Sequence, residues 1–170
     1  MGKPTGIVYT SNTGYTEKYA KLLGEQLGLP AFSAEQADSL PEGTEILYLG
    51  WLMAGVVKGY KKAAQRFSVA AVCGVGMGPA GSQDSDVRKN NAIPQKVPVF
   101  TLQGGFDITR LHGVYKLMMT IMAKTVGKSL AKKKNRTSDE NAMLELMLHG
   151  GNLVREENLM DVLNWVQAEQ

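Results

Sequence analysis

Residues 10–17 read Thr10-Ser11-Asn12-Thr13-Gly14-Tyr15-Thr16-Glu17 and join a short apolar run to a helical pattern. The run at 6–10 predicts a strand, and the leucine spacing within 15–27 predicts an amphipathic helix. A loop at such a junction offers unpaired backbone N–H groups and the positive end of the helix dipole to a phosphate. Its hydroxyl groups can donate further hydrogen bonds, and Gly14 lets the backbone come close. The loop therefore predicts a phosphate site, and an ordinary N-cap turn is the alternative.

Two other kinds of nucleotide site are disfavoured by what this loop lacks. It contains no lysine, whereas a nucleotide-hydrolysing P-loop needs one near the β- and γ-phosphates. The loop also lacks the glycine-rich fingerprint GxGxxG of dinucleotide-binding folds. The hydroxyl-rich loop thus fits a terminal monophosphate best.

The first hundred residues alternate short apolar runs with helical patterns, which is typical of βαβ units and a parallel sheet. Five strands are expected, at about 6–10, 31–34, 45–49, 69–73 and 97–102. A glycine-rich loop is expected over 74–81, directly after the fourth strand. Pro98 cannot donate a ladder hydrogen bond, so the fifth strand is expected at an edge of the sheet.

After the fifth strand the pattern becomes helical. One helical stripe is formed by Val114, Leu117, Met118, Ile121, Met122 and Thr125, and Met119 lies off it. Thr137 to Glu140 reads as a capping box that opens a second helix, which Gly150-Gly151 closes. We therefore expect one domain, 1–170, that carries a helical insertion at about 103–156 and ends in a helix over 159–166. The insertion exceeds what a five-stranded doubly wound fold needs, and it indicates a specialised role.

The stretch 11–17 matches the pattern hydroxyl–x–Thr–Gly–x–Thr–Glu after the first strand, and there the chain resembles the flavodoxin family. The resemblance implies an α/β fold with a flavodoxin-like doubly wound five-stranded parallel sheet, order 2-1-3-4-5. It also implies a bound flavin mononucleotide (FMN) whose phosphate lies in the loop 10–16. Two further loops would then hold the flavin ring: Trp51-Leu52-Met53-Ala54-Gly55 and Gly74-Val75-Gly76-Met77-Gly78.

The chemistry of these two loops suits such a ring. Ligands of open α/β sheets bind beyond the carboxyl ends of the strands, where both loops are expected. Tryptophan and methionine side chains suit a flat, largely apolar ring. Trp51 could instead be a buried core aromatic, and Gly55 would allow a backbone rearrangement near the flavin. The second loop has Val75 and Met77 where many flavodoxins have aromatics, which leaves one ring face open to a substrate.

The second half resembles the protoporphyrinogen-dehydrogenase-like branch of the flavodoxin superfamily. The resemblance rests on Gln103-Gly104-Gly105-Phe106-Asp107 and on the methionine-rich helix at 115–122. It implies an FMN-dependent oxidoreductase that passes electrons from a reduced organic substrate to a quinone. The alternative is an electron-carrier protein that serves a redox partner protein. Carriers of this family are typically acidic, whereas this chain has a formal charge of +3, so the enzyme is favoured. No catalytic residue is assigned.

Composition adds expectations about the compartment and the partners. Cys73 is the sole cysteine, so no disulfide can form within the chain and a cytoplasmic protein is expected. His112 and His149 have no metal-ligand spacing, and no metal is expected. A basic cluster of Lys128, Lys132, Lys133, Lys134 and Arg136 could contact an anionic membrane peripherally, meet the carboxylates of an acidic substrate, or simply be solvated. It lacks interleaved aromatic residues, so nucleic acid is not expected as a partner.

Overall fold

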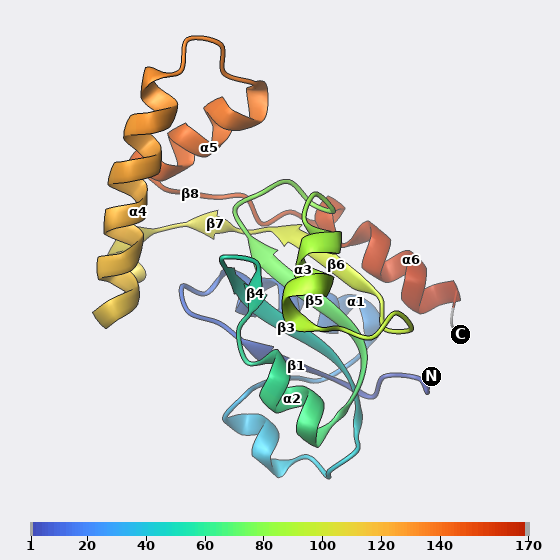
Figure 1. The fold of residues 1–170 in the computed structure, drawn as a ribbon. Coiled ribbons are helices and arrows are strands. Elements are labelled where there is room, and N and C mark those ends of the chain that lie inside the picture. The colour runs from blue at the N-terminus through green and yellow to red at the C-terminus, as the bar shows by residue number, and fades with distance from the viewer. Residues whose placement is uncertain (1, 169–170) are drawn as a thin grey trace.

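Five parallel strands form the centre of the molecule in a computed structural model, which describes residues 2–168 (Figure 1). They are β1 (Gly6–Thr10), β2 (Ala31–Ser33), β3 (Glu45–Met53), β5 (Ser68–Gly76) and β6 (Val99–Gln103). The sheet runs β2-β1-β3-β5-β6. An unexpected short strand, β4 (Val56–Val57), pairs antiparallel with the end of β3. The expected parallel α/β sheet is confirmed, and β6 lies at its edge as Pro98 predicted.

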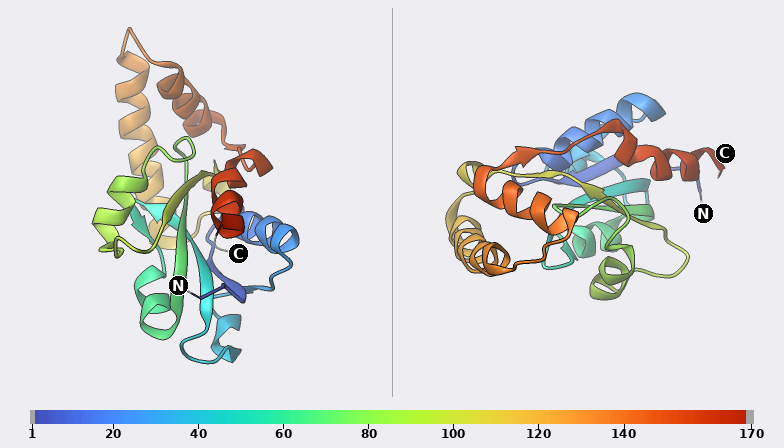
Figure 2. Two further views of the ribbon diagram at one scale, coloured as in Figure 1. Left: turned by 90° about the vertical axis from the view of Figure 1, so that its right-hand side faces the viewer. Right: turned by 90° about the horizontal axis from the view of Figure 1, so that it is seen from above.

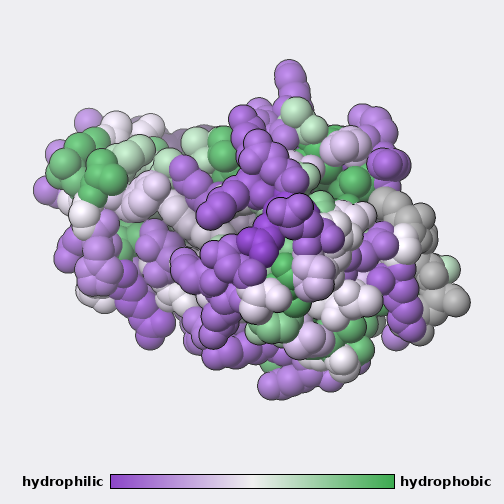
Figure 3. All heavy atoms as spheres, turned by 90° about the horizontal axis from the view of Figure 1, so that it is seen from below, coloured by the Kyte–Doolittle hydropathy of each residue, from purple (hydrophilic) through white to green (hydrophobic). Residues whose placement is uncertain are grey.

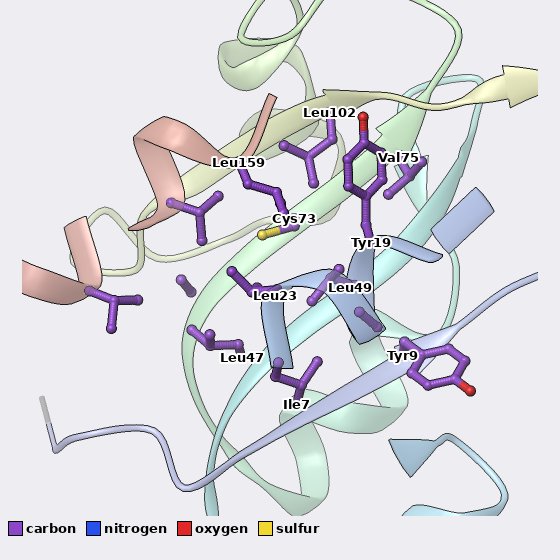
Figure 4. Packing of buried hydrophobic residues seen from close by; sticks show 14 of the residues in the cluster. Ile7, Tyr9, Tyr19, Leu23, Leu47, Leu49, Cys73, Val75, Leu102 and Leu159 are labelled. Atoms are coloured by element: carbon purple, nitrogen blue, oxygen red, sulfur yellow. The ribbon is translucent and has the colours of Figure 1, made fainter. Parts of the chain in front are cut away.

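Helices cover both faces of the sheet (Figure 2). One face carries α1 (Tyr15–Leu27) and α6 (Met160–Ala168), and the other carries α2 (Tyr60–Arg66) and α3 (Asp84–Asn91). Alternate strand residues point to opposite faces, so two hydrophobic cores form. In the first core, Tyr19 and Leu23 of α1 lie against Leu49 and Cys73 of the sheet (Figure 4). This packing fixes the start of α1, and hence the loop before it, relative to the carboxyl ends of the strands.

Gly50 and Gly74 lie inside β3 and β5, although the sequence led us to expect both strands to end before these glycines. Gly50 pairs with both Thr10 and Gly74, and Gly74 also pairs with Thr101. Neighbouring strands on both sides supply hydrogen bonds there, and they outweigh the weak strand propensity of glycine. The glycine-rich segment is therefore strand as far as Gly76, and only the residues after it form a loop.

The helical insertion leaves the sheet and returns to it through one narrow neck. Strand β7 (Gly105–Phe106) pairs antiparallel with β8 (Gly151–Asn152), and α4 (Gly113–Lys132) and α5 (Ser138–His149) lie between them. Figure 1 shows the two helices standing beside the carboxyl end of the sheet. The capping box is confirmed, because the Thr137 hydroxyl accepts from the Glu140 N–H while the Glu140 carboxylate accepts from the Thr137 N–H.

Helix α4 is turned differently from what its apolar stripe suggested. Val114, Leu117 and Ile121 of that stripe are all exposed. Met118 and Met122 of the same stripe line the cavity instead, together with Met119 and Val126 from outside it, so the inward face lies about a third of a turn from the exposed row. The stripe was expected to pack against the protein because apolar periodicity marks a buried face, but α4 carries apolar residues on two faces.

Candidate functional site

The phosphate loop, residues 10–16, joins the end of β1 to the start of α1. Gly14 is the N-cap of α1 with φ of 92°, a left-handed conformation that glycine adopts without strain. The Ser11 hydroxyl accepts hydrogen bonds from the N–H groups of Gly14 at 3.2 Å and Glu17 at 3.4 Å. Ser11 therefore caps the helix from three residues before its first turn, and it shapes the loop.

Several donors in this loop have no protein partner. Within residues 2–168, no acceptor lies in hydrogen-bond reach of the backbone N–H groups of Asn12, Thr13, Tyr15 and Thr16. The Asn12 side-chain Nδ2 is buried and is likewise without a partner in the described chain. A buried unsatisfied donor costs about 1–3 kcal/mol. The donor set therefore suits an anionic group with several acceptor oxygens, such as a phosphate.

Arg110 brings a positive charge to the same loop from the insertion. Its Nη1 donates to the Thr13 carbonyl oxygen at 3.3 Å, and its Nε lies 3.1 Å from an Asp107 carboxylate oxygen. The Thr109 hydroxyl donates to the Asp107 carboxylate, and this bond, helped by the Thr109 N–H and the Arg110 charge, lowers the pKa of Asp107. The carboxylate thus stays ionised and holds the guanidinium near Gly14. Sequence reasoning missed Arg110, since ninety-seven residues separate it from Thr13.

The first expected ring loop, Trp51–Gly55, is a β-hairpin rather than a free loop. Leu52 and Met53 pair with Val57 and Val56, and the turn between them has positive φ at Ala54 and Gly55. Two such residues side by side give the tight turn that matches the twist of the paired strands. The end of β3 is therefore held as a rigid wall.

Asn91, which is only 3% exposed, ties this hairpin to α3. Its Oδ1 accepts from the Val57 N–H at 2.9 Å, and its Nδ2 donates to the Gly55 carbonyl at 2.9 Å and the Val87 carbonyl at 2.7 Å. A backbone rearrangement at Gly55, as expected from the sequence, would have to break the bond to Asn91. Sequence reasoning missed both Asn91 and its helix, because α3 is strongly hydrophilic and has little apolar periodicity.

Trp51 points away from the two cores and lines a cavity. Its ring meets that of Tyr115 from α4 edge to face, with centroids 5.2 Å apart. The Lys58 Nζ lies 5.6 Å from the centroids of both rings. An edge-to-face pair with a nearby cation is a favourable arrangement, and it fixes the first turn of α4 against the hairpin.

The second expected ring loop begins inside β5. Val75, Gly76, Met77 and Gly78 line the cavity, whereas Gly74 does not. A Cβ at Gly74 would lie 2.9 Å from the Leu52 side chain, so Gly74 makes room for the neighbouring strand. Thr10, Ser11 and Gly14 also do not line the cavity, and the Thr10 hydroxyl instead bonds with the Tyr48 hydroxyl at 2.8 Å.

All three expected loops meet at one cavity of about 460 Å³. This volume lies in the range of pockets that hold small ligands and cofactors. From the three loops its lining takes Asn12, Thr13, Tyr15, Thr16, all five residues of 51–55, and 75–78. From elsewhere it takes Gln83, Gly105, Phe106, Asp107, Leu111, Met118, Met119, Met122, Val126, Met143 and Met147. The insertion therefore supplies one whole wall, in which five of the side chains are methionines.

Gly105 marks a close approach between this wall and the phosphate loop. A Cβ there would lie 2.7 Å from the Tyr15 ring and 2.4 Å from the Gly151 carbonyl oxygen. The neck of the insertion thus packs directly against Tyr15, and the cavity wall is fixed to the start of α1.

Comparison of the chain with family models, with curated proteins and with solved structures found no match. Over residues 2–168, no helix has the length and apolar character that a membrane crossing requires. In the same part of the chain, no three His, Cys, Asp or Glu side chains are grouped so that they could hold a metal ion.

Proposed function

We propose that this chain is a flavodoxin-like FMN-dependent oxidoreductase, with FMN bound noncovalently in the cavity described above. The observation that carries the proposal is the meeting of three separate loops, those after β1, β3 and β5, at one largely apolar cavity beside a set of unpaired donors. The sequence alone marks each of these loops as a candidate flavin contact. Their common position at the carboxyl edge of the sheet is where α/β folds bind ligands.

In this proposal the monophosphate lies at the N-terminus of α1. The backbone N–H groups of Thr13, Tyr15 and Thr16 would donate to its oxygens, and Asn12 lines the same part of the cavity. Arg110 would add a cation that phosphate loops built from hydroxyls and glycine do not contain. Together with the helix dipole, these groups favour a dianion.

The flavin ring would lie between the Trp51–Gly55 hairpin and the segment Val75–Gly78. Apolar and sulfur-containing side chains dominate this part of the cavity, which suits a flat aromatic ring. Gly76 and Gly78, which line the cavity without side chains of their own, would present backbone to the ring.

When bound, FMN supplies the redox chemistry: a reduced organic substrate loses two electrons and two protons, and a quinone gains both and becomes the hydroquinone. The chain's own part is to hold the ring and to exclude water from it. The methionine wall of α4 and α5 supports an enzyme over an electron carrier, because a carrier exchanges electrons through an exposed ring edge with a partner protein. Met119, Met122 and Met143 instead leave an apolar space that suits an organic molecule.

The cofactor is tested by a matched pair of glycine variants on α1. Gly14→Ala and Gly28→Ala each place an alanine in a left-handed backbone conformation. Gly14 lies at the N-terminal end of α1 and Gly28 at its C-terminal end. Both should destabilise the protein to a similar degree, but only Gly14→Ala should weaken FMN binding, measured by flavin fluorescence titration. Equal affinities of the two variants for FMN would place the phosphate elsewhere.

The oxidoreductase activity is tested on the FMN-loaded protein without oxygen. Reduced organic substrates should bleach the flavin absorbance, and a short-chain soluble quinone should restore it. Restoration only by electron-transfer proteins, and never by a quinone, would favour the carrier instead.

A further inference from the structure

The outward face of α4 is apolar in its first half. Val114 and Leu117 are each 62% exposed and Ile121 is 56% exposed. Their spacing of three and four residues aligns them on one side of the helix. Monomeric proteins seldom expose aliphatic side chains in a continuous row, and such a row marks an interaction surface.

The same face is basic in its second half. Continued at the same spacing, it reads Lys124, Lys128 and Lys132. All three are exposed, and none has an ion-pair partner among residues 2–168. We call the six residues Val114, Leu117, Ile121, Lys124, Lys128 and Lys132 the outer stripe of α4.

The chain segment that carries the outer stripe is strongly basic. From Ile108 to Ser138 the chain contains eight Lys and Arg residues and no Asp or Glu. Three of the cations have structural roles: Arg110 pairs with Asp107, Lys133 pairs with Glu140 at 2.6 Å, and Arg136 bonds to the last carbonyl groups of α4. The expected basic cluster at 128–136 is therefore partly used to hold the turn between α4 and α5, whereas the lysines of the outer stripe are not.

We propose that the outer stripe of α4 docks the protein on an anionic lipid surface, with the three aliphatic side chains in the acyl boundary and the three lysines against the headgroups. Helices that combine an apolar row with lysines lie in the plane of such an interface. Charge selects this occupant over a second copy of the chain, since two outer stripes placed face to face would bury unpaired lysines against one another if parallel, or against the aliphatic side chains if antiparallel. Figure 3 shows a hydrophobic patch at the left-hand end of the molecule, on the side where α4 lies in Figure 1, surrounded by hydrophilic residues.

Docking in this orientation would place the cavity beside the lipid. Met118 lines the cavity and is also 46% exposed next to the aliphatic row. A lipid-dissolved quinone would then reach the flavin past Met118 without crossing water. This consequence rests on the proposed function, whereas docking itself does not.

The test is cosedimentation with vesicles of mixed phosphatidylcholine and phosphatidylglycerol, and it needs no flavin. Lys124→Gln with Lys128→Gln should weaken binding roughly thirtyfold, because each basic residue near an anionic surface contributes about 1 kcal/mol. The matched control is Lys61→Gln with Lys62→Gln, which removes the same charge from exposed positions on α2 and should leave binding unchanged.

The apolar half of the outer stripe has its own control. Leu117→Ser with Ile121→Ser should weaken vesicle binding at least tenfold, whereas Met160→Ser, at a similarly exposed apolar position on α6, should not. All these side chains are exposed, so folding should be retained, and circular dichroism checks this. Equal binding to pure phosphatidylcholine vesicles, or unchanged binding of both stripe variants, would overturn the proposal. A dimer in solution that the Leu117 and Ile121 changes disrupt would also overturn it, in favour of a second copy.

Discussion

Arg110 donates a hydrogen bond from Nη1 to the carbonyl oxygen of Thr13, so a residue of the insertion stands at the loop where the phosphate is proposed to bind. The contact connects two parts of the site that lie far apart in the chain. In the proposed function it gives the insertion a role in holding the cofactor as well as in covering it.

We expect Arg110→Gln to weaken FMN binding about tenfold while leaving riboflavin binding unchanged. A hydrogen bond to a charged group contributes about 1.5–3 kcal/mol, and the partial exposure of this guanidinium places it near the lower end. Fluorescence titrations with the two flavins measure the difference directly, because riboflavin lacks the phosphate. Lys89→Gln, which removes an exposed cation from α3, is the control. An equal loss of affinity for both flavins would show that Arg110 acts on the fold and not on the phosphate.

We expect Asn91→Ala to lower the free energy of unfolding by about 3 kcal/mol. The change leaves the buried Val57 N–H and Gly55 carbonyl without a partner, at about 1–3 kcal/mol for each unsatisfied group. Urea denaturation measures the loss. Asn90→Ala, at the adjacent exposed position, should change stability by less than about 0.5 kcal/mol. Similar values for the two variants would mean that the hairpin is held by its own turn and not by α3.

Tryptophan fluorescence reports the position of the ring. The chain contains two tryptophans: Trp51 lines the cavity, and Trp165, on α6, packs against Phe100 of β6. FMN should therefore quench Trp51 more strongly. The Trp165→Leu protein should show strong quenching on FMN addition, and the Trp51→Leu protein should show much less. Stronger quenching in the Trp51→Leu protein than in the Trp165→Leu protein would show that the flavin ring does not lie beside the hairpin.

Alkaline stability should depend on Tyr48. Its hydroxyl donates to the Lys58 carbonyl at 2.7 Å, and burial raises its pKa to about 12. A raised pKa in the folded state stabilises the protein fully below the unfolded value near 10, and this contribution is lost as the pH rises toward 12. Between pH 10 and 12, Tyr48→Phe should therefore lose less stability than the parent, by up to about 1.4 kcal/mol per pH unit.

Burial also raises the pKa of the Cys73 thiol to about 12 and raises the pKa of Tyr9, Tyr15, Tyr19 and Tyr60, so the parent and Tyr48→Phe share these further titrating groups. The difference between their pH slopes isolates Tyr48. Urea denaturation at several pH values provides both slopes, and parallel slopes would contradict the assignment.

The sequence predicted the order of strands and helices near the phosphate loop well, because the signals there are local. The alternation of apolar strands with the α1 pattern needs only neighbouring residues, and so does the capping box at Thr137. Features that depend on tertiary neighbours were missed. Gly74 stays in a strand because strands on both sides bond to it, and α3 forms although few of its residues are apolar.

The candidate site shows the same division. The three loops could be selected from residue type and position after a strand, and all of them contribute to the cavity lining. Which side of α4 faces that cavity could not be predicted, since Tyr115, Met119 and Met122 face inward while an equally apolar row faces out. Contacts such as that between Arg110 and Thr13 carry no sequence signal, because neither residue is unusual in its own segment.

Because β7 and β8 are paired, the segment between them could be exchanged for another one. The first and last residues of the insertion lie opposite each other as paired strands, Gly105 against Asn152 and Phe106 against Gly151, so the chain enters and leaves the insertion at the same place. A tight turn that connects β7 directly to β8 would rejoin the chain without moving β6 or α6. Segments of other shapes could be inserted at the same position. The range of molecules that bind in the cavity could then change, while the sheet and the helices packed on it stay the same.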